Sequence, residues 1–139
     1  NLVHRDIKPA NILFRENFNE PILTDFGIVR DLQATSETKT WLSRGPGTPF
    51  FASPEQLIND KALIDWRSDQ FSLGITLSLC AFGQHPFQHE GFSSGRTVDE
   101  VANKGQTSEH FKISIQESGL TALPIMISAW PASRYRTAD

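Results

Sequence analysis

The residues best suited to chemistry are crowded near the start of the chain. Asp6, Lys8 and Asn11 lie within six residues, and Asp25 follows 14 residues after Asn11. A carboxylate orients an attacking hydroxyl and receives its proton, and a lysine offsets charge on a moving phosphoryl group. Amide and carboxylate oxygens are ligands that Mg2+ accepts. This set predicts phosphoryl transfer from a nucleotide.

Each of these residues also has an ordinary structural explanation. An isolated Asp or Asn in a loop is most often a turn or capping residue. The run Asp25-Phe26-Gly27, taken alone, suits any turn that follows a strand. The order and separation of the two groups favour the chemical interpretation, because both are needed for the same reaction.

The elements that position these residues are predicted to be short strands first and helices afterwards. Apolar runs at 11–14 and 21–24 flank a polar turn at 15–20 and predict a β-hairpin, with 27–30 as a candidate third strand. Residues 31–47 have little apolar periodicity and are expected to form a loop of a length that is uncommon unless it is functional.

Capping patterns predict where the helices begin. Ser53, followed by Pro54 and by Gln56, is expected to cap one helix. Ser68 is expected to open a second, which runs to about residue 82 and has apolar residues all round, as is typical of a buried helix. A capping box at Thr97 predicts a third that stops by residue 105.

Composition excludes several kinds of site. The chain has 139 residues with 13 Lys and Arg against 16 Asp and Glu, a formal net charge of −3. This balance gives no general attraction to nucleic acid or to an anionic membrane. One cysteine and four scattered histidines form neither a disulfide framework nor a recognisable zinc site.

Five motifs in one order resemble the catalytic domain of the protein kinase superfamily. Lys8, two residues after Asp6, is the serine/threonine form, and the chain as a whole most resembles serine/threonine kinases of the bacterial and eukaryote-like type. The motifs are the catalytic loop at 4–11, the magnesium motif at 25–27, the end of the activation segment at 47–55, the start of the central helix at 68–74, and the late arginine segment at 131–135.

The resemblance implies an α+β, protein-kinase-like fold: a mainly helical C-terminal lobe with short β-strands around the catalytic loop. Residues 1–139 would form part of this domain, with the activation segment at 25–55 and the central helix at about 68–82. The N-terminal lobe and the final helix are expected to be absent, since a complete domain is about twice as long. The helix that precedes the catalytic loop in this family, and packs on the central helix, is expected to be missing too. Phe71 and Ile75 are therefore expected to be exposed, and the isolated chain to be poorly soluble and inactive.

The resemblance also implies catalytic roles for individual residues. Asp6 would be the catalytic base and Lys8 the cation beside the γ-phosphate, with Thr48 contacting both. Asn11 and Asp25 would bind Mg2+.

ATP and Mg2+ are therefore the expected cofactors. Lys8 would also contact the bound nucleotide, and Leu13 would pack beneath its adenine. Plain core packing explains an apolar residue at position 13 equally well.

A second group of residues is expected to be structural. His4 and Phe26 would belong to a hydrophobic spine that links the active site to the central helix. Asp69 would accept hydrogen bonds from the catalytic-loop backbone, with an ordinary helix cap as the alternative. Glu55 and Arg134 would form a buried ion pair that tethers the activation segment.

A third group is expected to be regulatory. Arg5, directly before Asp6, would bind a phosphate placed on the activation loop. The candidate phosphorylation sites are Thr35, Ser36, Thr38, Thr40 and Ser43, although hydroxyl residues also populate solvated loops.

The function implied is transfer of the ATP γ-phosphoryl group to Ser and Thr hydroxyls of protein substrates. The alternatives are a pseudokinase that acts as a binding scaffold and a small-molecule phosphotransferase. The resemblance implies a cytoplasmic catalytic domain with no nucleic-acid partner, and it leaves membrane anchoring through other segments open.

Overall fold

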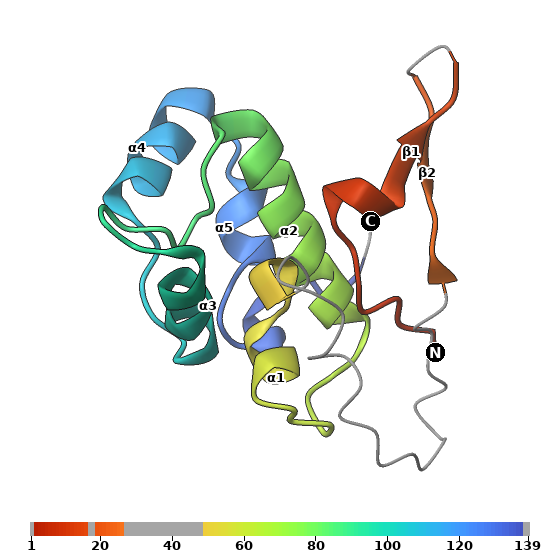
Figure 1. Cartoon of the computed structure of the whole chain (residues 1–139), viewed down its shortest axis with the longest axis horizontal. Helices are drawn as coiled ribbons and strands as arrows, with labels where there is room; N and C mark the ends of the chain where they lie inside the picture. The colour runs from red at the N-terminus through yellow and green to blue at the C-terminus, as the bar shows by residue number, and fades with distance from the viewer. Residues whose placement is uncertain (1, 17–18, 27–48, 138–139) are drawn as a thin grey trace.

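The computed structural model describes residues 2–16, 19–26 and 49–137. Short elements come first and α-helices follow, with α2 running through the middle (Figure 1). The elements are η1 (Pro9–Asn11), β1 (Ile12–Phe14), β2 (Pro21–Leu23), η3 (Pro49–Phe51), α1 (Pro54–Leu57), α2 (Trp66–Phe82), α3 (Ser94–Ala102), α4 (Glu109–Ser118), α5 (Ala122–Met126) and η4 (Pro131–Ser133).

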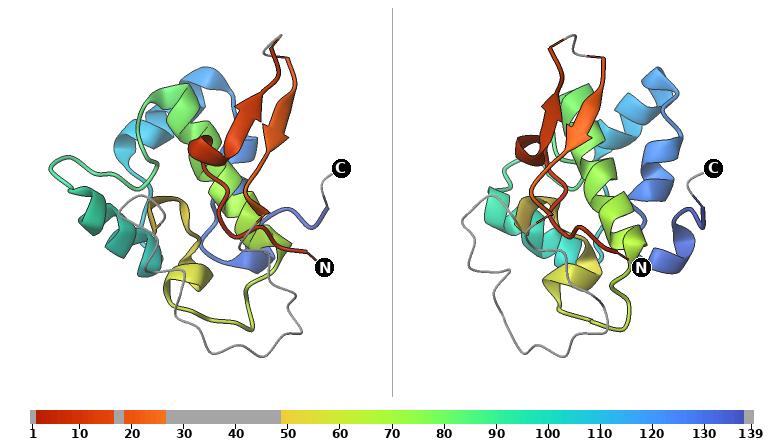
Figure 2. Two further views of the ribbon diagram at one scale, coloured as in Figure 1. Left: turned by 45° about the vertical axis from the view of Figure 1, so that its right-hand side comes forward. Right: turned by 90° about the vertical axis from the view of Figure 1, so that its right-hand side faces the viewer.

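The predicted hairpin is present. β1 and β2 pair antiparallel, with Ile12 opposite Leu23 and Phe14 opposite Pro21. Both views in Figure 2 show the hairpin standing beside α2 rather than among the other helices. The proposed third strand at 27–30 and the loop at 31–47 lie outside the described residues.

The central helix begins two residues earlier than expected, at Trp66 rather than Ser68. Asp65 is its N-cap, because its side chain accepts a hydrogen bond from the backbone N–H of Arg67 at 2.8 Å. Gly83 ends the helix with φ 69°, a left-handed conformation that glycine adopts without steric cost.

The expectation that Phe71 and Ile75 are exposed is wrong, since each is 0% exposed. They belong to the core, which they form with Phe87, Val101, Phe111, Leu123 and Ile127. The exposed face of α2 carries Leu77 instead, at 43%. The reason is the close packing of α5 on α2: a Cβ at Gly74 would lie only 2.7 Å from Ile127 Cγ2.

The third helix also begins earlier than its sequence pattern predicts. Ser93 caps α3 by accepting from the N–H of Arg96 at 3.3 Å, whereas Thr97 is buried inside the helix. Lys104, with φ 55°, takes the left-handed position after the helix, and Gly105 follows it. Among the described residues, no helix is long and apolar enough to span a membrane.

Candidate active site

Asp6, Lys8 and Asn11 form one hydrogen-bonded group at the start of the chain. The Asp6 carboxylate is buried, and its Oδ2 accepts from Lys8 Nζ at 2.9 Å and from Asn11 Nδ2 at 3.1 Å. Asn11 Nδ2 also donates to the Asp6 carbonyl at 2.8 Å. Both side chains thus hold the same carboxylate oxygen, which leaves Oδ1 as the oxygen that they do not occupy.

The hairpin brings Asp25 beside this group. The Asn11 carbonyl accepts from the N–H of Thr24 at 2.9 Å and from its hydroxyl at 3.2 Å, so Asp25 follows directly after the residue paired with Asn11. Asp25 is exposed and has φ 60°, a left-handed backbone conformation. The antiparallel register therefore converts a separation along the chain into proximity in space.

These two side chains fit a magnesium ion by their chemistry. The amide nitrogen of Asn11 is committed to Asp6, so the amide oxygen is the atom left for a ligand. Asp25 adds a carboxylate at the exposed end of β2. Mg2+ takes oxygen ligands and keeps several waters, which suits a site with two protein donors among the described residues. No larger cluster of His, Cys, Asp and Glu that could hold a metal occurs in the described ranges.

His4 is a packed structural residue, as the resemblance implies. It is 4% exposed, and its ring lies 4.9 Å from the Phe26 ring in an edge-on arrangement. Its Nδ1 accepts from the N–H of Asp6 at 3.3 Å, so the ring hydrogen is on Nε2, which donates to the Thr24 carbonyl at 2.9 Å. His4 thereby ties the catalytic loop to the end of the hairpin.

Asp69 holds the catalytic loop through its backbone. Its two carboxylate oxygens accept from the N–H groups of His4 and Arg5, each at 2.7 Å. Burial raises the pKa of Asp69, and these hydrogen bonds only partly oppose that rise. The alternative that Asp69 caps the helix is wrong, since Asp65 has that role.

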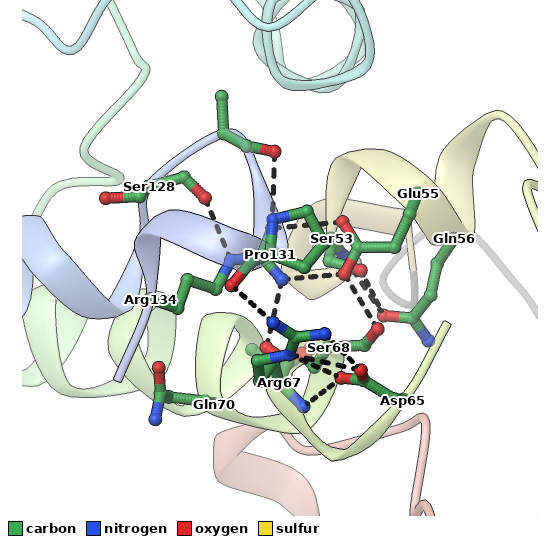
Figure 3. Close-up of polar contacts among 12 residues, drawn as sticks. Ser53, Glu55, Gln56, Asp65, Arg67, Ser68, Gln70, Ser128, Pro131 and Arg134 are labelled. Carbon is green, nitrogen blue, oxygen red and sulfur yellow. Dashed lines mark hydrogen bonds and ion pairs between the residues drawn. The ribbon is translucent and has the colours of Figure 1, made fainter. Parts of the chain in front are cut away.

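The expected ion pair between Glu55 and Arg134 is present and fully buried. Arg134 donates to Glu55 through two nitrogens, at 2.6 and 3.0 Å, and the side chains are 0% and 2% exposed (Figure 3). Burial alone raises the pKa of Glu55, but Arg134 and the Ser68 hydroxyl, which donates at 2.7 Å, outweigh it and lower the pKa.

Several residues at this junction were missed by sequence reasoning. Ser68 reaches Glu55, Arg67 pairs with Asp65 at 2.6 Å, and Gln56 donates to the Arg5 carbonyl at 3.1 Å. Sequence patterns offered a signal only for Gln56, as the third helical residue of a capping box, and that signal predicts its local role alone.

The remaining predicted site residues are less closely tied to this group. Leu13 is 55% exposed, so core packing does not explain it. Phe26 is 52% exposed, although its ring contacts that of His4. Outside the described residues lie Thr35, Ser36, Thr38, Thr40, Ser43 and Thr48.

Comparison with known proteins gives consistent matches. A family model described as the protein kinase domain matches residues 1–136. Serine/threonine-protein kinase AfsK of Streptomyces griseus is 40% identical over 108 residues, which are 78% of this chain and 12% of that protein. Serine/threonine-protein kinase PknB of Mycobacterium tuberculosis is 32% identical over 142 aligned positions, covering 99% of this chain and 21% of that protein.

A solved protein kinase structure superposes on nearly the whole of this chain. The twitchin kinase region from C. elegans superposes with a TM-score of 0.71 at 26% identity, and the match covers 97% of this chain and 23% of that one. The chain spans only part of the length of its relatives: 12% of AfsK and 21% of PknB.

Proposed function

Since the chain belongs to the protein kinase family, we propose that these residues are the catalytic part of a serine/threonine kinase that transfers the ATP γ-phosphoryl group to protein hydroxyls. One observation carries the proposal. One buried carboxylate oxygen of Asp6 accepts from Lys8 and Asn11 at 2.9 and 3.1 Å, and Asp25 directly follows Thr24, which pairs with Asn11 across the hairpin. The named relatives, both serine/threonine kinases, support the acceptor class.

Asp6 acts as the base in this proposal. Its Oδ1 accepts the hydrogen bond of a substrate Ser or Thr hydroxyl and takes the proton as the new bond from oxygen to the γ-phosphorus forms. The bond from that phosphorus to the β,γ-bridging oxygen breaks, and ADP leaves. Lys8 and Asn11 hold Oδ2, so the carboxylate keeps one orientation during the reaction.

Lys8 and the metal-binding pair supply the positive field. Lys8 Nζ, fixed by Asp6 at 2.9 Å, is close enough to the base to neutralise charge on the transferred group. Asn11 Oδ1 and the Asp25 carboxylate would hold Mg2+, which when bound offsets the charge of the phosphate oxygens.

The test is transfer of labelled phosphate from ATP by the whole protein that contains this chain, with and without Mg2+. Asp6→Asn keeps the size and the hydrogen bonds of the side chain but is a poor base, so kcat is expected to fall by about 10²–10⁴-fold. Transfer by the wild type that collapses in Asp6→Asn supports the proposal.

The same comparison separates a kinase from the pseudokinase alternative. A well-folded wild type that transfers no phosphate to itself or to a generic protein substrate would favour a binding scaffold. Equal transfer by the wild type and by Asp6→Asn would remove Asp6 from the catalytic role.

We also propose that Arg5 recognises a phosphorylated residue of the activation loop. Guanidinium groups bind phosphate with two parallel hydrogen bonds, which orders the segment that carries it. Phosphosite mapping of active protein is expected to find at least one modified residue among Thr35, Ser36, Thr38, Thr40 and Ser43. Active protein with none of them modified would contradict this part of the proposal.

A further inference from the structure

Gln56 connects helix α1 to the catalytic loop, 51 residues away in sequence. Its Nε2 donates to the Arg5 carbonyl at 3.1 Å, and the residue is only 6% exposed. Its Oε1 accepts from the backbone N–H of Ser53 at 3.1 Å and from the Ser53 hydroxyl at 3.0 Å (Figure 3). Because a backbone N–H can only donate, this bond establishes which end of the amide faces Ser53 and which faces Arg5.

The Arg5 carbonyl belongs to the same peptide group as the N–H of Asp6. That N–H donates to His4 Nδ1 at 3.3 Å, while Gln56 holds the opposite edge of the peptide. The plane of this peptide sets where the Cα of Asp6 lies and hence where its carboxylate points. Gln56 therefore acts one peptide group away from the proposed base, with no described contact to its side chain.

Arg5 itself is in an unfavourable backbone conformation. Its φ is 67°, a left-handed value that residues with a Cβ adopt at a cost. Such a residue persists only when surrounding contacts hold it. Two described contacts do so: Asp69 accepts its N–H at 2.7 Å, and Gln56 donates to its carbonyl.

The local role of Gln56 does not require an amide. In the capping box the side chain at this position only accepts a hydrogen bond from the N-cap residue, and glutamate does that as well as glutamine. The Nε2 donor is not needed for capping, and it is the atom that donates to the Arg5 carbonyl. A glutamate would instead place a carboxylate oxygen against the Arg5 carbonyl, where two acceptors repel.

We infer that Gln56 is a positioning residue for Asp6, which sets the 5–6 peptide plane through its bond to the Arg5 carbonyl. It thereby couples the α1 segment, anchored by the neighbouring Glu55–Arg134 pair, to the catalytic loop. The expected effect on kcat rests on the proposed function of Asp6, whereas the expected effect on how firmly the catalytic loop is held does not.

The experiment compares Gln56→Glu and Gln56→Met with the wild type in the whole protein. Gln56→Glu retains the acceptor of the capping box and loses the donor, whereas Gln56→Met loses both. For each variant kcat per folded enzyme is expected to fall by about tenfold to a hundredfold, because a small misplacement of a catalytic group has effects of this size. The KM for ATP is expected to change by less than about twofold, since the lost interaction acts on the chemical step.

Gln70 provides a matched control. Its Oε1 accepts from the N–H of Tyr135 at 3.0 Å. Tyr135 lies near the end of the sequence, far along the chain from the catalytic loop. Gln70→Glu makes the same chemical change as Gln56→Glu, and kcat is expected to stay at the wild-type value. A fall in melting temperature with unchanged kcat in both Gln56 variants would mean a purely structural role and would overturn the inference.

Amide hydrogen exchange tests separately whether Gln56 holds the catalytic loop in place. In Gln56→Glu the amides of residues 4–8 are expected to exchange faster, while those of α4 stay at the wild-type rate. Unchanged exchange at residues 4–8 overturns the inference whatever the activity. If the wild type transfers no phosphate, the proposed function and the expected effect on kcat fall together, and the exchange result alone decides whether Gln56 holds the loop.

Discussion

At the residue scale, the arginine–carboxylate pairs at the two ends of the Arg134 site differ in burial. The Glu55–Arg134 side chains are 2% and 0% exposed, whereas those of Asp65 and Arg67 are 32% and 28% exposed. Arg134 also donates to the carbonyls of Ser128 and Arg67, at 2.8 and 2.9 Å. Removing Arg134 therefore leaves several buried acceptors without their donor.

Arg134→Ala is expected to lower the free energy of unfolding by about 3–5 kcal/mol, since it leaves Glu55 charged, buried and unpaired. Urea denaturation of the folded domain measures this. Arg67→Ala is the control, because a half-exposed pair contributes roughly 1 kcal/mol or less. Equal losses in the two variants would contradict the prediction.

The buried His85 is expected to make the fold less stable in acid. It is 1% exposed, and burial lowers its pKa to about 4, opposed only in part by its bond to the Phe50 carbonyl at 2.9 Å. The unfolded chain therefore binds a proton below pH 6.5 that the folded chain takes up only near pH 4. The contribution of His85 to the free energy of unfolding is therefore unchanged above pH 6.5 and falls below it, by roughly 3 kcal/mol once the pH reaches 4.

The measurement is the free energy of unfolding between pH 7.5 and 4.5, for which His85→Gln is expected to give a flatter curve than the wild type. His110→Gln, at an exposed position on α4, is the control and is expected to follow the wild type. The depressed pKa of Glu55 adds its own loss of stability only as the pH falls below 4.5, outside this window. The raised pKa of Asp69 opposes this loss equally in both proteins, so equal slopes for the wild type and His85→Gln between pH 6.5 and 4.5 would rule out the assigned role of His85.

At the element scale, the contact between α2 and α5 depends on a missing side chain. A Cβ at Gly74 would lie 2.7 Å from Ile127 Cγ2 and 3.0 Å from Met126 Cβ. Alanine is the better helix former by about 1 kcal/mol, but overpacking a core typically costs about 1–3 kcal/mol. The steric effect is therefore expected to prevail.

Gly74→Ala is expected to lower the melting temperature, and Gly95→Ala, on α3, to leave it unchanged or slightly raise it. The nearest atom to a Cβ at Gly95 is Ser93 Oγ, at 3.9 Å, which is ordinary contact. Thermal unfolding followed by circular dichroism distinguishes the two. A rise in melting temperature for Gly74→Ala would show that α5 yields without cost.

The elements themselves were predicted unevenly. The hairpin was correct because apolar runs and a polar turn specify it locally. The starts of α2 and α3 were wrong because several residues near each start have side chains that can cap a helix. Asp65 and Ser68 compete at α2, and Ser93 and Thr97 at α3, and burial of the later residue in each pair decides the outcome.

At the scale of the whole molecule, large apolar side chains remain exposed on several elements, among them α2 and the hairpin. Leu77 on α2 is 43% exposed, and Leu13, Phe14 and Ile22 on the hairpin are 55%, 54% and 37% exposed. The hairpin stands beside α2 rather than packing among α3, α4 and α5 (Figure 1). Exposed apolar side chains favour association with other apolar surfaces.

The 139-residue chain studied by itself is expected to self-associate, and Leu77→Gln to reduce that association. Because Leu77 is half exposed, the free energy of unfolding should change by less than about 0.5 kcal/mol. Sedimentation velocity and denaturation measure the two quantities. Ile75→Gln is the control: it introduces a polar group at a fully buried position and should destabilise the fold without improving solubility. A monodisperse wild-type chain would contradict the prediction.

The sequence by itself determined the local chemistry of this protein. Asp6, Lys8 and Asn11 are close in space because they are close in the chain, and the hairpin that brings Asp25 to Asn11 is specified by its own apolar runs and turn. The resemblance then supplied two contacts between distant residues, Glu55 with Arg134 and Asp69 with the catalytic loop.

Only the tertiary structure decided how the distant helices meet the site. Nothing in the local pattern indicated that Ser68 completes the Glu55 site or that Gln56 reaches Arg5. Periodicity and capping patterns describe how a segment satisfies its own backbone. Hydrogen bonds between segments depend on how close the packed helices bring their side chains, and that distance is set by core residues such as Phe71, Gly74 and Ile127 rather than by the bonding residues themselves.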